Sequence, residues 1–373
     1  MTLALLLFAA APALQWSATI GEGYSPPAAN EQLVCTLSRQ GADEVVSCFH
    51  RTTGKPAWRD SYNAPFQKNS AAQQMSSAPY SPPVIQGDTL FTLGGMAHLR
   101  AYTVTSGKLK WQRAPAKPVS TSKVFYGTAM TPLLDQGRLI VFWGDDFAGE
   151  LLALDPATGK TLWSNATERP VYASLAIGII AGLRQYITLS EEHVFGVDAA
   201  TGKTLWTIPF KDQWNENIIT PVVIGDTVIV SGIRKPTTAY VIARTASGWS
   251  AQEKWALPNL PMYLSNPVLD GTTLYGLTNR DKGRLFALDV TTGKQLWASE
   301  GRYASNVQLR IDARTLYALT DTGELIASDI TSGRPIEKQR FEVAKTAVWA
   351  APVLAGRQLF IRDQTSLRAF ALP

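Results

Sequence analysis

One twelve-residue phrase recurs along the chain and limits the possible fold more than any other feature. It is LALDPATGKTLW at 152–163, FGVDAATGKTLW at 195–206 and FALDVTTGKQLW at 286–297. Each copy has an apolar run, an Asp, a Thr-Gly pair and a final Trp. The Asp side chain can accept backbone N–H hydrogen bonds in the following turn, and Gly tolerates the positive φ that such a turn needs. The phrase therefore predicts a strand, a tight turn and a second strand.

Weaker copies extend this repeat over most of the chain. Those at 48–58 and 101–111 keep the Trp four residues after the Gly, the copy at Gly248 delays its Trp to position 255, and the copy at 327–337 has Glu337 instead. Two further strand-like runs precede each phrase, so each unit is expected to contain four strands. The turn glycines of successive recognisable copies are roughly 40 to 53 residues apart, the length of a propeller blade.

The repeat also predicts how the ring closes. The last unit, from residue 350 to the end, provides only three strands, and residues 14–20 around Trp16 match the missing outer strand. We therefore expect residues 14–373 to form one all-β, eight-bladed propeller of four-stranded antiparallel blades, closed by pairing of the N- and C-terminal strands. The repeat positions are Trp16, Trp58, Trp111, Trp163, Trp206, Trp255, Trp297, Gly54, Gly107, Gly159, Gly202, Gly293, Gly333, Asp155, Asp198, Asp289 and Asp329.

The first thirteen residues have the pattern of a secretory signal peptide. An apolar run ends in the small-x-small sequence at 11–13, which predicts export and a periplasmic or cell-envelope location. No Lys or Arg precedes the apolar run, so a buried strand or a start site further upstream is the alternative interpretation. Leu14, and not a Cys, comes directly after Ala13, so from the sequence as written we expect no lipid anchor.

The two cysteines lie in strand-like runs joined around Gly41 and Ala42. If these two residues form the loop of a hairpin, Gln40 pairs with Asp43, and the same register pairs Cys35 with Cys48. The cysteines then occupy a non-hydrogen-bonded pair, where Cβ atoms of opposite strands come closest. We expect a disulfide here, and two reduced, buried thiols are the alternative.

Composition excludes several classes of protein. A hydrophobic fraction of 45% with 17% charged residues is typical of a folded globular chain rather than a disordered one. The net charge of +5 comes without a cluster of basic residues, so no nucleic-acid partner is expected. No later stretch approaches the ~20 apolar residues that span a bilayer. We expect a monomeric propeller without a transmembrane segment.

The phrase at 153–163 and 287–297 resembles the pyrroloquinoline-quinone-type propeller repeat, over nearly the whole mature chain. One branch of that superfamily, the quinoprotein dehydrogenases, implies pyrroloquinoline quinone, Ca²⁺, a catalytic Asp and often adjacent cysteines, which this chain does not have. The other branch, the BamB-like scaffolds, implies no cofactor and a protein partner, the outer-membrane barrel-insertion subunit. We expect a non-catalytic periplasmic scaffold. A quinoprotein dehydrogenase or its relic, and a sensor of small molecules or cell-wall fragments, are the alternatives.

Two sets of residues are candidates for function. Asp145, Asp146 and Glu150 could supply oxygen ligands to a hard cation, although a solvated hairpin turn is the preferred interpretation. The repeat tryptophans are predicted to be structural, between neighbouring blades. Aromatic and basic residues outside the repeat are the candidate interaction surface: Trp143, Trp214, Trp249, Tyr263, Trp349, Arg234, Lys235 and Arg310.

Overall fold

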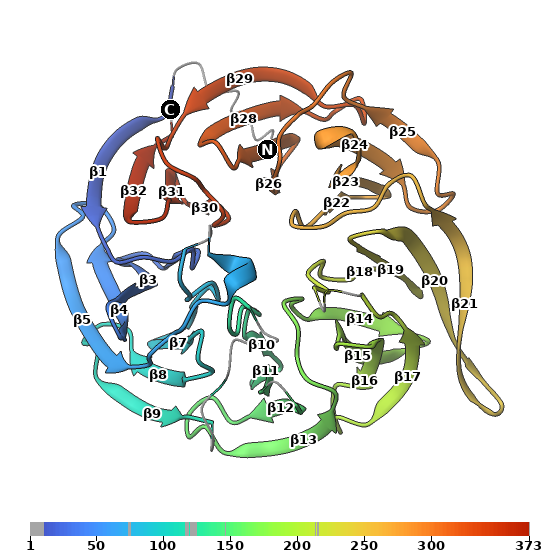
Figure 1. Cartoon of the computed structure of the whole chain (residues 1–373), viewed down its shortest axis with the longest axis horizontal. Helices are drawn as coiled ribbons and strands as arrows, with labels where there is room; N and C mark the ends of the chain where they lie inside the picture. Colours follow the sequence, from blue (N-terminus) through green and yellow to red (C-terminus); the bar gives the residue numbers. More distant parts are fainter. Residues whose placement is uncertain are drawn as a thin grey trace, which may run out of the picture.

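The computed structural model contains eight four-stranded antiparallel sheets arranged around a central axis (Figure 1). It describes residues 11–372 except 74–75, 116–118, 120–124, 146, 213 and 215. Seven sheets are built from four consecutive strands each, and the eighth combines the two ends of the chain. The prediction of an all-β, eight-bladed propeller is confirmed.

The first four blades begin after the N-terminal strand, and in each the first strand lies nearest the axis (Figure 1). Blade 1 has β2 (Ala28–Ala29), β3 (Leu33–Gln40), β4 (Asp43–His50) and β5 (Pro56–Asn63), and blade 2 has β6 (Val84–Gln86), β7 (Thr89–Leu93), β8 (Leu99–Thr103) and β9 (Leu109–Arg113). Blade 3 has β10 (Leu133–Asp135), β11 (Arg138–Gly144), β12 (Gly149–Leu154) and β13 (Thr161–Thr167), and blade 4 has β14 (Ala176–Ile180), β15 (Leu183–Leu189), β16 (His193–Asp198) and β17 (Thr204–Pro209).

The remaining blades follow the same plan. Blade 5 has β18 (Val222–Ile224), β19 (Thr227–Gly232), β20 (Lys235–Thr245) and β21 (Gly248–Leu257), and blade 6 has β22 (Val268–Asp270), β23 (Thr273–Thr278), β24 (Arg284–Asp289) and β25 (Gln295–Ala298). Blade 7 has β26 (Val307–Asp312), β27 (Thr315–Thr320), β28 (Glu324–Asp329) and β29 (Ile336–Glu342). Blade 8 has β30 (Val353–Ala355), β31 (Gln358–Arg362), β32 (Ser366–Ala371) and β1 (Ala13–Thr19). Two short 3₁₀ helices, η1 (Ser70–Ala72) and η2 (Arg280–Lys282), lie in loops.

The ring closes through the N-terminal strand, as the repeat predicts. Strand β1 pairs antiparallel with β32, which places Trp16 opposite Ala369, with a bulge between Leu14 and Trp16. Most of the predicted signal peptide, residues 1–10 of 1–13, lies outside the described residues, so that assignment stays a prediction. Pairing the two ends covers the edge of β32, which would otherwise present unpaired backbone groups.

The side chain of Arg362 fixes blade 8 to blade 1. This guanidinium is completely buried and donates hydrogen bonds to the carbonyl oxygens of Gly23 (3.1 Å) and Leu37 (2.5 Å) and to the Thr36 hydroxyl (2.8 Å). Burial lowers the pKa of Arg362 to about 9. A buried cation is tolerated when its donors are satisfied in this way, so the arginine bonds the closing blade to the segment that begins the ring.

The turn in the repeated phrase forms for the reason that the sequence suggests. The Asp155 carboxylate accepts the backbone N–H groups of Ala157 (2.7 Å) and Thr158 (3.3 Å), and Gly159 has a φ of +71°. The Gly159 N–H donates to the Asp155 carbonyl oxygen at 2.8 Å and closes the turn. The same arrangement recurs at Asp198 with Gly202 and at Asp289 with Gly293.

Tryptophans on outer strands join neighbouring blades at these turns. The Trp111 Nε1–H donates to the Pro156 carbonyl oxygen (2.8 Å), three residues before the turn glycine of the next blade. A Cβ atom on Gly159 would lie 2.7 Å from the Trp111 ring, so only glycine allows this contact. We call this combination of indole hydrogen bond and ring contact a tryptophan dock. Equivalent docks are formed by Trp16 with Gly54, Trp58 with Gly107 and Trp255 with Gly293. Trp163 makes only the ring contact, with Gly202.

Two of the repeat tryptophans, Trp206 and Trp297, depart from this pattern. The Trp206 Nε1–H donates to Gln185 of its own blade (2.7 Å), because the long β20–β21 hairpin moves the corresponding turn of blade 5 away. At Gly333 the N–H bonds to the Ile330 carbonyl oxygen (2.9 Å), which is the position that accepts the indole elsewhere. Consistent with this, no atom lies within 4 Å of a Cβ built on Gly333, and Trp297 does not dock there.

The position of Glu337 in blade 7 has a simple explanation. Blade 8 has no turn between its third and fourth strands, because these strands come from opposite ends of the chain. A tryptophan at 337 would have no turn to dock on. Glu337 instead forms an ion pair with Arg340 (2.9 Å) on the solvent side of β29.

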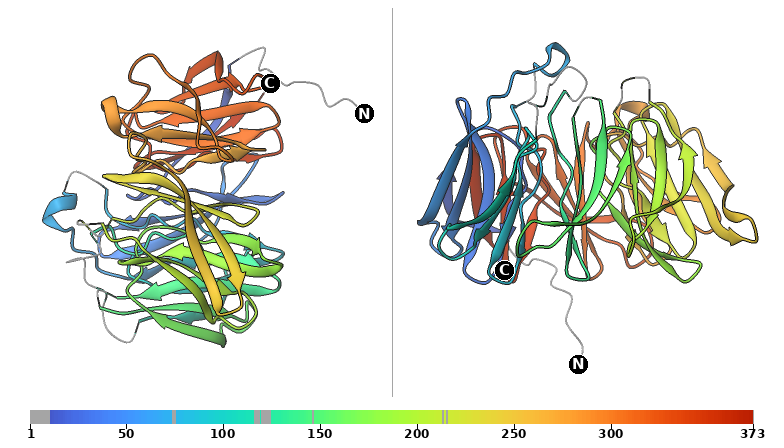
Figure 2. Two further views of the ribbon diagram at one scale, coloured as in Figure 1. Left: turned by 90° about the vertical axis from the view of Figure 1, so that its right-hand side faces the viewer. Right: turned by 90° about the horizontal axis from the view of Figure 1, so that it is seen from below.

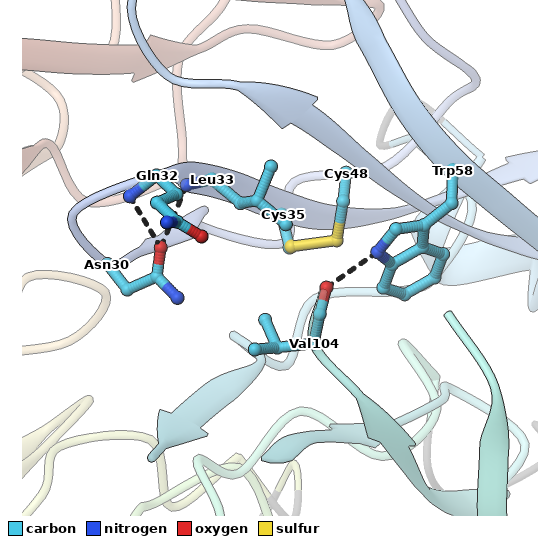
Figure 3. The surroundings of a disulfide bond; sticks show 7 residues. All are labelled: Asn30, Gln32, Leu33, Cys35, Cys48, Trp58 and Val104. Atoms are coloured by element: carbon cyan, nitrogen blue, oxygen red, sulfur yellow. Dashed lines mark hydrogen bonds between the residues drawn. A yellow bond between two sulfur atoms is a disulfide. The ribbon is translucent and has the colours of Figure 1, made fainter. Parts of the chain in front are cut away.

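The disulfide lies in the hairpin predicted for it (Figure 3). Gln40 pairs with Asp43 around the Gly41-Ala42 loop, and in the same register Cys35 pairs with Cys48, with their Cα atoms 4.1 Å apart. Both cysteines are fully buried. The predicted Cys35–Cys48 bond is therefore confirmed.

Candidate functional site

The propeller has two faces with different kinds of loops. The connections between blades and the hairpins between second and third strands lie on one face, which we call the connection face; the turns of the repeated phrase lie on the other. The side view in Figure 2 shows η1, in the β5–β6 connection, on the connection face. Because strand order fixes this division, it also places each candidate residue.

Five of the predicted interaction residues belong to the connection face. Trp214, Tyr263 and Trp349 lie in connections between blades, and Arg234 and Lys235 lie at the β19–β20 hairpin. The side chain of Trp214 is 50% exposed. Phe147, in the β11–β12 hairpin of this face, is not one of the predicted residues, although it is the most exposed of the large apolar residues that the structure describes, at 84%.

The other three predicted interaction residues lie elsewhere and do not join this group. The Trp143 Nε1–H donates to the Ala97 carbonyl oxygen (2.8 Å), and the ring packs beneath Arg113, so this residue joins blades 2 and 3. Trp249 lies in β21 and packs partly against the core between blades 4 and 5. Arg310 is exposed on the inner strand β26.

The acidic hairpin of blade 3 forms a turn. The Asp145 carboxylate accepts the N–H groups of Phe147 (2.8 Å) and Ala148 (3.0 Å), as a turn-capping Asp does. Asp146 lies outside the described residues, and Glu150 lies on β12. Across the part of the chain that the structure describes, no three His, Cys, Asp or Glu residues are grouped so as to hold a metal ion.

A small pocket of about 160 Å³ lies among the inter-blade connections around the axis. Tyr80, Tyr126, Ala129, Tyr172, Ile218, Leu264, Gln308 and Trp349 line it. Five of them, Tyr80, Tyr126, Tyr172, Ile218 and Leu264, follow one another at intervals of 46 residues. Blades 2 to 8 each contribute a lining residue, so the pocket is a product of the repeat, with a different side chain from each blade.

Half of the pocket wall is aromatic. The rings of Tyr24, Tyr80, Tyr126 and Tyr172 form a continuous series, which we call the tyrosine arc, with centroid separations of 6.0, 5.8 and 5.5 Å. The last two pairs meet edge to face, a favourable arrangement of aromatic quadrupoles. Burial raises the pKa of all four phenols, which are therefore neutral at physiological pH.

A buried carboxylate lies beside the arc. Glu216, two residues before Ile218 of the pocket wall, is 9% exposed and accepts a hydrogen bond from the Tyr263 hydroxyl. Burial raises the pKa of Glu216, and its charge raises the pKa of Tyr126 and Tyr172. The pocket therefore combines apolar and aromatic walls with one nearby acidic group. This arc was not among the residues predicted from the sequence, although the 46-residue spacing of Tyr80, Tyr126 and Tyr172 was a usable signal.

These groups do not fit the Ca²⁺ site that the dehydrogenase alternative implies. Ca²⁺ takes six to eight oxygen ligands, several of them carboxylates. Glu216 already accepts from Tyr263, and the neighbouring buried Asp212 accepts the N–H of Trp214 at 2.5 Å. These two carboxylates are the ones found here among the described residues, and they fall short of the ligand set that Ca²⁺ takes.

A second cavity, of about 360 Å³, lies at the junction where Trp297 is undocked. Its wall includes Trp297, Tyr303, Arg334 and Glu337, from blades 6 and 7 and the segment between them. The Tyr303 hydroxyl is buried and has no hydrogen-bond partner in the structure. This cavity is the space that a docked indole would help to fill at a regular junction.

The fold, the repeated turn and the tryptophan docks define a propeller of the pyrroloquinoline-quinone type. The sequence matches the family model described as "Outer membrane protein assembly factor BamB" over residues 42–299 and 281–372. The chain belongs to this family. A comparison with curated proteins found no match.

Solved structures share the fold at low sequence identity. BamB from Moraxella catarrhalis has a TM-score of 0.68 at 15% identity, with 97% of this chain and 100% of that chain covered. A europium-containing methanol dehydrogenase has a TM-score of 0.65 at 11% identity, covering 96% and 93%. The quinohemoprotein alcohol dehydrogenase of Comamonas testosteroni has 0.64 at 12%, covering 96% and 76%. Likeness at this identity shows the fold and leaves function to the site.

Among the described residues, no helix has the length and apolar character needed to cross a bilayer.

Proposed function

We propose that this chain is a non-catalytic, cofactor-free scaffold of the periplasm that binds a protein partner through its connection face. Family membership supports this role, because the matching model is that of an outer-membrane assembly factor. The observation that carries the proposal is the exposure of Phe147 and Trp214 on one face. Exposed aromatic residues are typical anchors of protein interfaces.

The partner that we propose is the barrel-insertion subunit of the outer-membrane assembly machine. Blade 5 adds a basic hairpin, with Arg234 exposed at its tip, to the same face as the two aromatic residues. Aromatic anchors that share a face with a basic residue suit a partner surface that is partly apolar and partly acidic.

The disulfide supports export. Bonds of this kind form and persist in oxidising compartments such as the periplasm, and are rare in the cytosol. Both cysteines of the chain are committed to the Cys35–Cys48 bond.

Site-specific photo-crosslinking in envelope preparations tests the interface. A photoreactive amino acid at Phe147 is expected to give a crosslink to the barrel-insertion subunit, identified by mass spectrometry. The matched control has the same amino acid at Lys160, an exposed turn residue on the opposite face, and is expected to give none. A crosslink to this subunit from position 160 alone would contradict the proposal, and so would the absence of a crosslink from both positions.

Reconstitution tests the absence of a cofactor. The purified chain, mixed with pyrroloquinoline quinone and Ca²⁺ and then desalted, is expected to retain no quinone absorbance and to show no dye-linked alcohol oxidation. Stoichiometric retention of the quinone with turnover would instead establish the dehydrogenase alternative.

A further inference from the structure

We infer that the axial pocket is a binding site for an alkylammonium cation of about the size of a trimethylammonium group. This inference concerns the centre of the ring and does not rest on the protein partner proposed above. The observations behind it are the aromatic wall, the buried carboxylate beside that wall and the size of the pocket.

The pocket wall has the composition of an aromatic cage. Tyr80, Tyr126, Tyr172 and Trp349 contribute four aromatic rings to one small cavity. The faces of such rings carry negative electrostatic potential, and several rings around one cavity are the usual protein receptor for a quaternary ammonium group. The remaining wall, which includes Ile218 and Leu264, suits the methyl groups of such a cation.

Charge favours a cation over a neutral apolar ligand. Glu216 is buried beside the arc, and it accepts a hydrogen bond from a neutral hydroxyl, that of Tyr263. The neighbouring buried cation, Arg169, forms an ion pair with Glu191 (2.7 Å), so its charge is compensated by another carboxylate. A bound ammonium group would supply the positive charge near Glu216, and attraction between such charges is strong where water is excluded.

The size of the pocket suits a small head group. A volume of about 160 Å³ accommodates a trimethylammonium group. The pocket lies among the inter-blade connections, so it is placed on the connection face. The alkylammonium cation can belong to a free small molecule, or it can be the end of a longer chain such as a lysine side chain.

Ligand-observed NMR titration of the mature chain tests the inference. The probes are choline and its neutral carbon isostere 3,3-dimethylbutan-1-ol, which have nearly the same shape. We expect choline to bind at least about tenfold more tightly than the isostere, because only choline carries a positive charge that the ring faces and Glu216 attract. Nα-acetyl-lysine amide, titrated in parallel, shows whether a lysine side chain is also accepted. Equal binding of choline and the isostere, or no binding of choline, would overturn the inference.

Variants then locate the site. Glu216→Gln keeps an acceptor for the Tyr263 hydroxyl and removes the charge; we expect about a tenfold loss of choline affinity and unchanged binding of the isostere. The matched control, Glu192→Gln, removes an exposed carboxylate that pairs with Lys211, and choline affinity is expected to stay the same. If Glu216→Gln does not fold, Tyr126→Leu is the second variant, and it too is expected to weaken choline binding. Choline affinity that is unchanged in a folded Glu216→Gln or Tyr126→Leu variant would place the ligand elsewhere and refute the assignment.

Discussion

The Arg138 guanidinium donates a hydrogen bond to the carbonyl oxygen of Ala199, 3.1 Å away in the next blade. This carbonyl lies three residues before Gly202, the position that accepts the indole N–H at the docks of Trp16, Trp58, Trp111 and Trp255. As a result, the Nε1–H of Trp163 is buried without a hydrogen-bond partner among the described residues. One arginine therefore makes this dock unlike the other four.

Replacing Arg138 by Met is expected to release the Ala199 carbonyl oxygen for Trp163. Burying an unpaired N–H costs roughly 1 to 3 kcal/mol, and an ordinary hydrogen bond contributes about 1 kcal/mol, so we expect the free energy of unfolding to stay the same or to rise by about 1 kcal/mol. Urea unfolding followed by tryptophan fluorescence measures the change. A loss of stability larger than about 1 kcal/mol would show that the arginine bond outweighs the missing indole bond.

The docked and undocked tryptophans should differ in their contribution to stability. Trp111→Leu removes an indole that contacts Gly159 and bonds to Pro156, and is expected to destabilise the fold by about 3 kcal/mol. Trp297→Leu affects an indole beside a cavity and should cost about 1 kcal/mol. Chemical denaturation measures the free energy of unfolding of the two variants. Equal losses of this free energy would show that a docked indole stabilises the fold no more than an undocked one.

The disulfide should stabilise the first blade. It closes a short loop, with a sequence separation of 13, for which chain entropy predicts about 3 kcal/mol. The double variant Cys35→Ala, Cys48→Ala is expected to unfold at lower temperature in calorimetry, and a reducing agent should lower the transition of the natural chain but not that of the variant. A variant as stable as the oxidised chain would contradict this expectation.

Strand β1 should be required for a monomeric ring. Removing residues 1–19 exposes the edge of β32, which presents unpaired backbone groups to other chains. We expect this truncated chain to self-associate in size-exclusion chromatography with light scattering. Removal of residues 1–12, which leaves β1 intact, is the control and should remain monomeric.

Asp135 should make stability depend on pH in the acid range. Hydrogen bonds from the Arg184 guanidinium (2.5 Å) and the Tyr186 hydroxyl (2.8 Å) of the next blade lower its pKa below the ordinary 3.8. A folded-state pKa below the unfolded value adds stability that is present above pH 3.8 and lost as the pH falls through the lower value. We therefore expect Asp135→Asn to be less stable than the natural chain at neutral pH, with the difference shrinking below pH 3.8. A difference that is independent of pH would contradict this.

Much of the architecture follows from local sequence. The Asp155 and Gly159 turn, the disulfide hairpin and the number of blades are fixed by interactions between residues close in the chain, and these repeat at regular intervals. Even ring closure could be predicted, because Trp16 matches a repeat position that the last unit does not have. The off-repeat candidates were less predictable, since residues such as Trp143 and Trp214 differ only in their three-dimensional surroundings.

The sequence by itself therefore determined the blade, its turn and the eightfold count, because hydrogen bonding within one hairpin depends on a few neighbouring residues. Only the tertiary structure decided which tryptophans dock, because each dock needs a free carbonyl group in the next blade. Arg138 occupies this carbonyl at Ala199, and the N–H of Gly333 occupies it at Ile330. It alone also gathered residues from separate blades, such as Tyr80 and Trp349, around one axial pocket. Contacts between distant segments depend on how the blades are placed around the axis, and the pattern within one blade does not specify that.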